Sequence, residues 1–551
     1  MPDLSYKEFM DEIRQRLKGF SLDDYKNLIL HWAGEVLPAE RRRFLGKLAP
    51  AANPRINHDL IDDVSAFARR VEKGDYCDGW GWDDDIHEER DWGDESWAGE
   101  MDDFFLQANY LLGKGYPHVA RQVYESLFDI LEIGQEPGHL PGDSDVTCML
   151  QVDVHEQVAL FLRSVYLTTD SEKRPDEIHT ILMKYGNLYG PVSLQNIIEA
   201  REEGLPDFDD FLAAWVELLL VQAPRTVSQL LREAVLLKGG IAAISEFARQ
   251  YPGEHPEAYI DWINGLDWEQ DVDLILQIAR EGLSRIPADY SVRADVAEFI
   301  VRIGERNLDG ELTLEGYREC FYARPSVSYL IDLYFNAIEN NCFDEVRDQA
   351  ERRVMELYSE GIAYRELYTY VPEGVVYMTL LFGGKYQQVY EMCVDQSSLG
   401  WSSGANPKPV FVAYMMMILA KTSSPIVVNQ LWDTTIMNIS SRLGGKDYEK
   451  CRKIMGYVRE AVPLGRVQEE YYLDFIIDII GQRVDAIVGG KYRNSYGKAA
   501  TLLVAAVETL ASRNEGQRGV ELLDEFCQKY LRHSAFKREL ANTLKLSHLQ
   551  K

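Results

Sequence analysis

The feature that most constrains this chain is the recurrence of apolar residues at steps of three and four along most of its length. Within residues 104–131 one such set is Phe104, Phe105, Ala108, Leu111 and Leu112, and the next is Ala120, Val123, Tyr124, Leu127, Phe128 and Leu131. This spacing puts each set on one face of an amphipathic helix. The turn between them, Gly113-Lys114-Gly115-Tyr116, is so short that the two helices must lie antiparallel.

A glycine turn between two amphipathic runs returns further along the chain, at Gly239-Gly240, Gly383-Gly384 and Gly489-Gly490. We expect Gly384 and Gly490 to occupy left-handed turn positions, where a side chain with a Cβ is strained. Alternating apolar and polar runs of the kind that form strands are nearly absent. We therefore predict an all-α fold: a tetratricopeptide (TPR)-like array of degenerate helical hairpins stacked as an α-solenoid.

Residues 73–103 break this pattern, because they contain thirteen acidic side chains against Lys73 and Arg90, four tryptophans and five glycines. The glycines disfavour a helix, so we predict a linker. The expected organisation is then a helical module at 1–72, the acidic Trp-rich linker at 73–103, a helical-hairpin array at 104–395, a Gly/Ser/Pro-rich loop at 396–409 and a C-terminal helical-hairpin module at 410–551.

The tryptophans of the acidic segment need an explanation, since indole rings seldom stay fully exposed without a reason. In one interpretation the segment folds back and its rings dock on the first helical hairpin. In another it is a docking strip for a basic protein, and the partner-binding residues are then Trp80, Trp82, Trp92, Trp97, Asp83, Asp84 and Asp85. A metal site that adds His87 to these aspartates is the least favoured, because consecutive carboxylates cannot all converge on one ion.

Charge and cysteine content narrow the possible functions. The 551 residues carry 89 acidic and 58 basic side chains, a net charge of −31, which disfavours direct binding to nucleic acid or to anionic membranes. The seven cysteines form no C-x-C or C-x-x-C pair, so the sequence contains no zinc or dithiol motif. We predict neither a bound metal nor a cofactor. No apolar run approaches the roughly 18–20 residues of a membrane-spanning helix, and the first residues do not resemble a signal peptide. We expect a cytoplasmic protein with reduced thiols.

One pentapeptide, Gly400-Trp401-Ser402-Ser403-Gly404, matches the G-x-S-x-G nucleophile elbow of serine hydrolases. That elbow requires a sharp strand-to-helix turn above a sheet. Here a helical pattern precedes the pentapeptide, Asn406-Pro407 follows it, and no sheet is predicted. A serine hydrolase using Ser402 is therefore the alternative hypothesis, and an ordered loop between hairpins is the favoured one.

Four passages carry a resemblance to a known group of proteins. They are the acidic Trp segment with Leu111-Leu112-Gly113-Lys114-Gly115-Tyr116, then Phe321-Tyr322-Ala323-Arg324-Pro325-Ser326, then Leu399-Gly400-Trp401-Ser402-Ser403-Gly404, and finally Tyr492-Arg493 with Arg532-His533-Ser534-Ala535-Phe536. In this order they resemble the helical region that follows the zinc finger in bacterial SWIM-type zinc-finger proteins. The resemblance implies a TPR-like fold and little chemistry. The finger itself needs C-x-C followed by C-x-H, which this chain lacks, so DNA binding is not implied.

The pattern as a whole predicts a non-enzymatic interaction scaffold. Stacked hairpins provide an extended surface for a protein or peptide, and the negative charge would steer a basic partner toward it. A more specific hypothesis is a regulator that sequesters a nucleic-acid-binding protein, such as a transcription factor, and is released by proteolysis in a stress or defence pathway.

Overall fold

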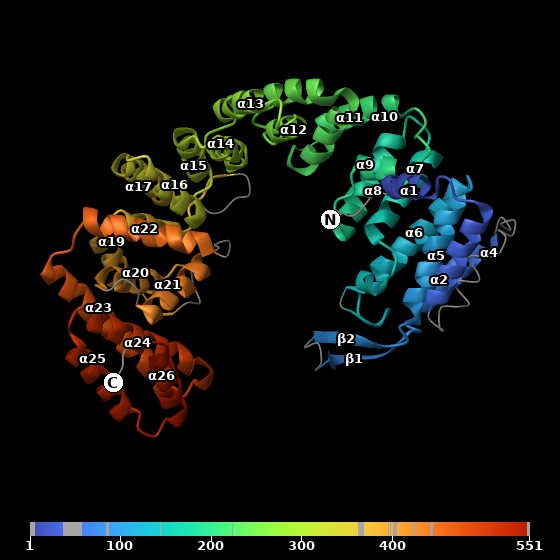
Figure 1. Ribbon diagram of the computed structural model, residues 1–551. Coiled ribbons are helices and arrows are strands. Elements are labelled where there is room, and N and C mark those ends of the chain that lie inside the picture. The colour runs from blue at the N-terminus through green and yellow to red at the C-terminus, as the bar shows by residue number, and fades with distance from the viewer. Residues whose placement is uncertain are drawn as a thin grey trace. The chain divides into compact units, whose positions relative to one another are not determined.

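The computed structural model describes residues 6–36, 58–83, 88–143, 145–222, 224–361, 368–394, 396, 398–400, 405–421, 425–440 and 445–547. These residues form 25 α-helices and one two-stranded antiparallel sheet. The chain divides into two compact units, residues 1–243 and 244–551, each built of helices packed in pairs (Figure 1). The all-α fold class of TPR-like helical hairpins is therefore confirmed.

The described residues of the first unit form nine complete α-helices, a short 3₁₀ helix, the sheet and most of α11. Its elements are α1 (Tyr6–Leu17), α2 (Leu22–Glu35), α4 (His58–Glu72), β1 (Cys77–Asp83), β2 (Glu88–Gly93), α5 (Ser96–Gly113), α6 (Pro117–Gly134), η1 (Val146–Met149), α7 (Val154–Thr168), α8 (Arg174–Tyr189), α9 (Leu194–Glu199), α10 (Phe208–Leu220) and α11 (Pro224–Gln250). The boundary between the units falls within α11, just after a kink at Gly240, whose φ of 61° and ψ of −154° are not helical.

The second unit continues the helical pairs to the end of the described residues. Its elements are α12 (Ala258–Asn264), α13 (Val272–Arg285), α14 (Arg293–Asn307), α15 (Gly310–Ala323), α16 (Val327–Glu339), α17 (Phe343–Glu360), α18 (Glu373–Phe382), α19 (Tyr386–Val394), α20 (Lys408–Leu419), α21 (Ile426–Ile439), α22 (Gly445–Ala461), α23 (Arg466–Gly489), η2 (Arg493–Ser495), α24 (Tyr496–Ser512), α25 (Gly516–Lys529) and α26 (Ser534–Leu546). Neighbours along the chain pack against each other, as α14 does against α15 and α24 against α25.

The apolar faces expected from the sequence are the faces that the helices bury. All the apolar residues singled out between 104 and 131 are buried, and α5 packs against α6 as the predicted antiparallel pair. Several such pairs are joined by the same tight turn, a Schellman motif. After α5, the Tyr116 N–H donates to the Leu111 carbonyl and the Gly115 N–H to the Leu112 carbonyl, and Gly115 takes a left-handed φ of 82°. The same left-handed position after other helices is occupied by Gly74, Leu308, Asn341, Gly384, Lys491 and Asn514.

Leu308 is the least suitable residue in these turns, because a residue with a bulky side chain is strained in the left-handed region. The Leu308 side chain is also 93% exposed. Replacing Leu308 by glycine should remove this strain without losing any packing. The left-handed strain that is relieved, about 1–2 kcal/mol, exceeds the added conformational entropy of the unfolded chain. We therefore expect Leu308→Gly to raise the free energy of unfolding by about 0.5–1 kcal/mol, measured by thermal denaturation. Leu308→Ala is the matched control, since alanine keeps the Cβ and should give no comparable gain.

The two glycines expected to be left-handed differ from each other. Gly384 has a φ of 74°, but Gly490 has a φ of −74° and Lys491 takes the left-handed position instead, so the expectation for Gly490 is wrong. Gly490 is nevertheless required, because a Cβ there would lie 2.6 Å from the Ala486 carbonyl oxygen. At Gly384 the added Cβ would also meet Val462 at 3.0 Å.

Valine at either of these positions should therefore destabilise the second unit. We expect Gly384→Val and Gly490→Val each to cost on the order of 1–3 kcal/mol of unfolding free energy, for different reasons: backbone strain at the first and backbone overlap at the second. Chemical denaturation would show this as a lower midpoint. Gly497→Val is a suitable control, because no atom lies within 4 Å of a Cβ built there; if it costs as much as the other two, local crowding is not the cause.

The prediction that residues 73–103 form a linker is wrong for the part of this segment that the structure describes. Residues 77–93 contribute the paired strands β1 and β2, and α5 already begins at Ser96, so the expected boundary at 103 falls inside a helix. Residues 1–72 were also expected to form a module separate from the hairpin array. The last helix of this range, α4, instead packs against α6 of the array. Phe67 of α4 is buried and lies 5.6 Å from the ring of Phe104.

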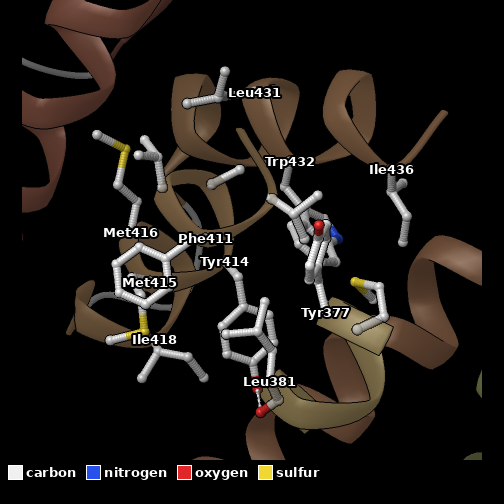
Figure 2. Close-up of a cluster of buried hydrophobic side chains, with 14 of the residues drawn as sticks. Tyr377, Leu381, Phe411, Tyr414, Met415, Met416, Ile418, Leu431, Trp432 and Ile436 are labelled. Carbon is white, nitrogen blue, oxygen red and sulfur yellow. Dashed lines mark hydrogen bonds between the residues drawn. The ribbon is translucent and has the colours of Figure 1, made fainter. Parts of the chain in front are cut away.

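The core of the second unit is dense around α20, where seven consecutive residues, 410–416, are buried. A helix that is apolar on every side must be surrounded by others, and α20 packs against α18, α21, α23 and α24. Figure 2 shows Tyr414 beside Leu381, whose carbonyl oxygen accepts a hydrogen bond of 2.9 Å from the Tyr414 hydroxyl. Met415 and Met416 belong to this core.

Buried carboxylates hold together segments that are distant in sequence. Glu508 of α24 accepts hydrogen bonds from the Val427 and Val428 N–H groups at 2.9 and 3.0 Å, and from the Ser547 hydroxyl at 2.6 Å. The first N–H groups of a helix have no partner within it, so Glu508 caps α21 from another hairpin. Glu233 caps α9 in the same way through the Leu194 N–H.

Arg513 is the centre of an ion-pair network between three helices. It follows α24, its side chain is only 3% exposed, and its guanidinium contacts Glu469 at 2.8 Å, Glu470 at 2.7 Å and Glu515 at 2.9 Å. Glu469 and Glu470 lie near the start of α23, and Glu515 immediately precedes α25. The more exposed Arg518 also contacts Glu470 and Glu515.

Candidate functional site

The acidic Trp segment forms a β-hairpin that extends from the helices of the first unit (Figure 1). In its register Trp80 lies opposite Asp91, and Trp82 lies opposite Glu89. Because side chains alternate along a strand, Trp80 and Trp82 share one face of the hairpin. Trp92 lies on the other face with Arg90.

The base of the hairpin is fixed to the helical body through Asp91. Its side chain accepts a hydrogen bond of 2.7 Å from the Gly138 N–H, and its carbonyl accepts one of 3.2 Å from the Gly142 N–H. Gly93 allows the chain to pass close to Tyr76, since a Cβ at this position would overlap the Tyr76 carbonyl oxygen. The two strands therefore have a defined attachment to the helical body.

The four tryptophans fall into two groups. Trp97, at the start of α5, is fully buried, and its indole N–H donates a hydrogen bond of 2.8 Å to the Pro141 carbonyl. Trp80, Trp82 and Trp92 remain 56%, 57% and 43% exposed. Trp97 is thus a core residue, and its prediction as a partner-binding residue is wrong. The other three rings stay available for contact.

The predicted aspartates are only partly visible. Asp83 ends β1, while its side chain, and Asp84 and Asp85 entirely, lie outside the described residues. Arg90 contacts Glu95 at 2.5 Å and lies 5.0 Å from the centre of the Trp92 ring, so this cation already has partners. His87, which completed the disfavoured metal site, also lies outside the described residues, and no group of three or more metal-ligating side chains occurs among those that are described.

A second surface feature, a cavity of about 280 Å³ between α5, α7 and the segment after α9, was not predicted from the sequence. The residues lining it include Leu106, Tyr110, Glu156, Leu160 and Arg201. Leu106 and Tyr110 are exposed apolar residues on α5 and lie off its buried face. Apolar residues outside the buried face of a helix were the only indication of this cavity in the sequence. The cavity presents a carboxylate, a guanidinium and apolar side chains together, a combination suited to a short peptide segment.

The Glu156 carboxyl is partly buried in this cavity. Burial raises its pKa, the negative charge of Asp153 raises it further, and Arg201 opposes the shift. A raised pKa in the folded state means that ionisation of Glu156 lowers stability as the pH rises above about 4, the value for an unfolded glutamate.

Replacing Glu156 by glutamine should therefore stabilise the first unit at neutral pH. We expect the difference in melting temperature between Glu156→Gln and the unchanged chain to vanish well below pH 4, where the glutamate is protonated in the folded and the unfolded chain. Glu136→Gln, on an exposed glutamate, is the control and should not show this dependence. An equal gain for Glu156→Gln at both pH values would contradict the desolvation of this carboxylate.

Ser402 and the other residues at 401–404 lie outside the described residues, so its geometry has no structural account. The neighbouring described residues belong to helix ends and loops: Tyr377 donates a hydrogen bond to the Ala405 carbonyl, and α20 begins at Lys408. Among the described residues the sheet is limited to β1 and β2, which lie in the other unit. No helix in the described part of the chain is long and apolar enough to cross a membrane.

Comparisons with known proteins identify no family. No family model matches the chain, and no curated protein matches it. Among solved structures, one similar chain is a "circular tandem repeat protein with novel repeat topology and enhanced subunit contact surfaces", at 13% identity over 88% of this chain and 96% of that one, with a TM-score of 0.16. So low a TM-score adds nothing to the fold, which is assigned from the helical pairs of this chain. The resemblance to SWIM-type zinc-finger proteins stays a prediction.

Proposed function

We propose that this protein is a non-enzymatic interaction scaffold that binds a basic protein segment at the β-hairpin. The observation that carries the proposal is the exposure of Trp80, Trp82 and Trp92 on two strands attached to the helical body, in a strongly acidic stretch of sequence. Exposed tryptophans are frequent interface hot spots. Carboxylates around them attract a cationic partner and disfavour pairing with a second copy of the same acidic hairpin.

The helical-repeat fold supports a binding role, since stacked hairpins provide an extended surface. The partner is a basic protein. In the more specific form of the proposal, it is a nucleic-acid-binding factor that this protein holds away from its target. Cytoplasmic location is supported by the free state of the seven cysteines, which suits a reducing compartment. Release of the partner by cleavage would act at exposed loop segments, and limited proteolysis of the complex tests that step.

The test is binding of short synthetic peptides rich in lysine and arginine, followed by fluorescence anisotropy. The variant replaces Trp80, Trp82 and Trp92 by alanine, and a control replaces the exposed Tyr358, Tyr457 and Tyr492 instead. We expect the tryptophan variant to lose at least about tenfold in affinity, or roughly 1.4 kcal/mol, at low and at physiological salt, because indole burial depends little on screening. Equal affinity for the tryptophan and tyrosine variants would overturn the proposal, as would equal binding of glutamate-rich peptides.

Charge and aromatic contact can be separated in the same assay. Replacing Asp83, Asp84 and Asp85 by asparagine should slow association mainly at low salt, since attraction between exposed charges is screened over about 8 Å at physiological ionic strength. Dissociation should change little. The natural partner would then be captured from cells with the unchanged chain and be lost with the tryptophan variant.

A further inference from the structure

A cavity in the second unit combines two arginines with a buried hydrogen-bond acceptor. It has a volume of about 140 Å³, lies between α20, α21 and α22, and is lined in part by Asn429, Arg452, Arg459, Met417 and Met455. None of its lining residues is acidic, although the chain carries 89 acidic side chains. A cavity of this size holds several water molecules, each of which needs on the order of 10–15 Å³, so a small ion fits.

The two arginines are brought together by the helix that carries them. Arg452 and Arg459 lie seven residues apart on α22, or about two turns, so they project from the same face with Met455 between them. Their contacts with the protein are long: Arg452 reaches Asp433 at 3.4 Å, and Arg459 reaches the Ala420 carbonyl at 3.4 Å. A guanidinium has five N–H donors, so most of this donor capacity is not used by these contacts.

Asn429 supplies the complementary group. Its side-chain N–H donates to the Pro425 carbonyl at 2.7 Å, which leaves the amide oxygen as the group that can face a ligand. That oxygen is buried and has no hydrogen-bond partner among the described residues. A buried acceptor without a donor costs free energy, and a ligand with an O–H group would remove that cost.

We propose that this cavity binds a protonated phosphate group. The anionic oxygens of orthophosphate suit the two guanidiniums, which bind phosphate in a planar, forked geometry, and its P–O–H group donates to the Asn429 amide oxygen. Orthophosphate keeps at least one proton throughout the neutral range, whereas sulfate has none. The group comes from free orthophosphate or from a phosphorylated side chain; the latter loses its last proton near pH 6, so free orthophosphate is the expected ligand.

Isothermal titration calorimetry of the full chain at neutral pH and constant ionic strength tests the site with sodium phosphate, sodium sulfate and a phosphoserine peptide. We expect orthophosphate to bind at least tenfold more tightly than sulfate. Arg452→Gln and Arg459→Gln should each weaken phosphate binding at least tenfold, whereas Arg532→Gln, on an exposed arginine outside the cavity, should not. Tighter binding of the phosphoserine peptide than of orthophosphate would overturn the proposal, because most of its phosphate has no P–O–H group at neutral pH to donate to Asn429.

Asn429→Ala separates the acceptor from the charges. Without the amide oxygen, phosphate and sulfate should bind with affinities within about threefold of each other, because only the guanidiniums remain. Circular dichroism verifies that each variant is folded, and the phosphate-to-sulfate ratio of the unchanged chain needs no variant. Absence of phosphate binding, equal binding of sulfate to the unchanged chain, or indifference to both arginine substitutions would overturn the proposal. Because the hairpin is not involved, these outcomes are independent of the scaffold function.

Discussion

Replacing Arg513 by methionine is expected to destabilise the unit of residues 244–551 by about 3 kcal/mol, because removing the buried cation of this network leaves its carboxylates only partly compensated. Methionine keeps the apolar stem of the side chain and removes only the guanidinium. The three glutamates that contact it would then keep only the more exposed Lys421 and Arg518 as cationic partners. The free energy can be measured by hydrogen exchange in these helices, since a chain of two units need not unfold in one step.

Arg518→Met is the matched control for this prediction. Arg518 contacts two of the same glutamates, but its side chain is 37% exposed, and exposed ion pairs contribute about 0–1 kcal/mol. We expect less than about 1 kcal/mol for Arg518→Met. A similar loss for both variants would mean that burial of Arg513 does not set the strength of the network.

The second large effect is expected at Trp97. Trp97→Ala removes a fully buried indole and its hydrogen bond to the Pro141 carbonyl, and a substitution of this kind costs about 3–5 kcal/mol. The melting temperature of the first unit should fall by several degrees. Hydrogen exchange should increase in the neighbouring α4 and α6, which share the same core.

Trp80→Ala and Trp82→Ala are the internal controls for Trp97, since they remove the same side chain from exposed positions of the hairpin. Each should change the free energy of unfolding by less than about 0.5 kcal/mol. This contrast distinguishes core tryptophans from contact tryptophans within one segment of sequence. Large losses at all four positions would show that the whole segment is part of the core, and would remove the basis of the proposed binding site.

The sequence by itself determined the helical architecture and the faces that the helices bury. The apolar spacing in α5 and α6 predicted both helices and their burial, because periodicity of three and four residues is a local property that any packing partner must satisfy. The left-handed glycine at Gly384 could be predicted from its place in a short turn. The left-handed Lys491 could not, because glycine is the usual residue at such a position and Gly490 stands next to it.

The tertiary structure alone decided which polar and aromatic residues are structural and which remain available. Trp97 and Trp82 stand in similar acidic, glycine-rich sequence, but only Trp97 has a neighbouring segment, around Pro141, to cover it. The cavity with Arg452 and Arg459 forms where α20 and α21 meet α22, and nothing in the local sequence of α22 specifies those neighbours. Contacts between residues far apart in the chain depend on how helices pack, and a one-dimensional pattern contains the faces of the helices but not the partners that they meet.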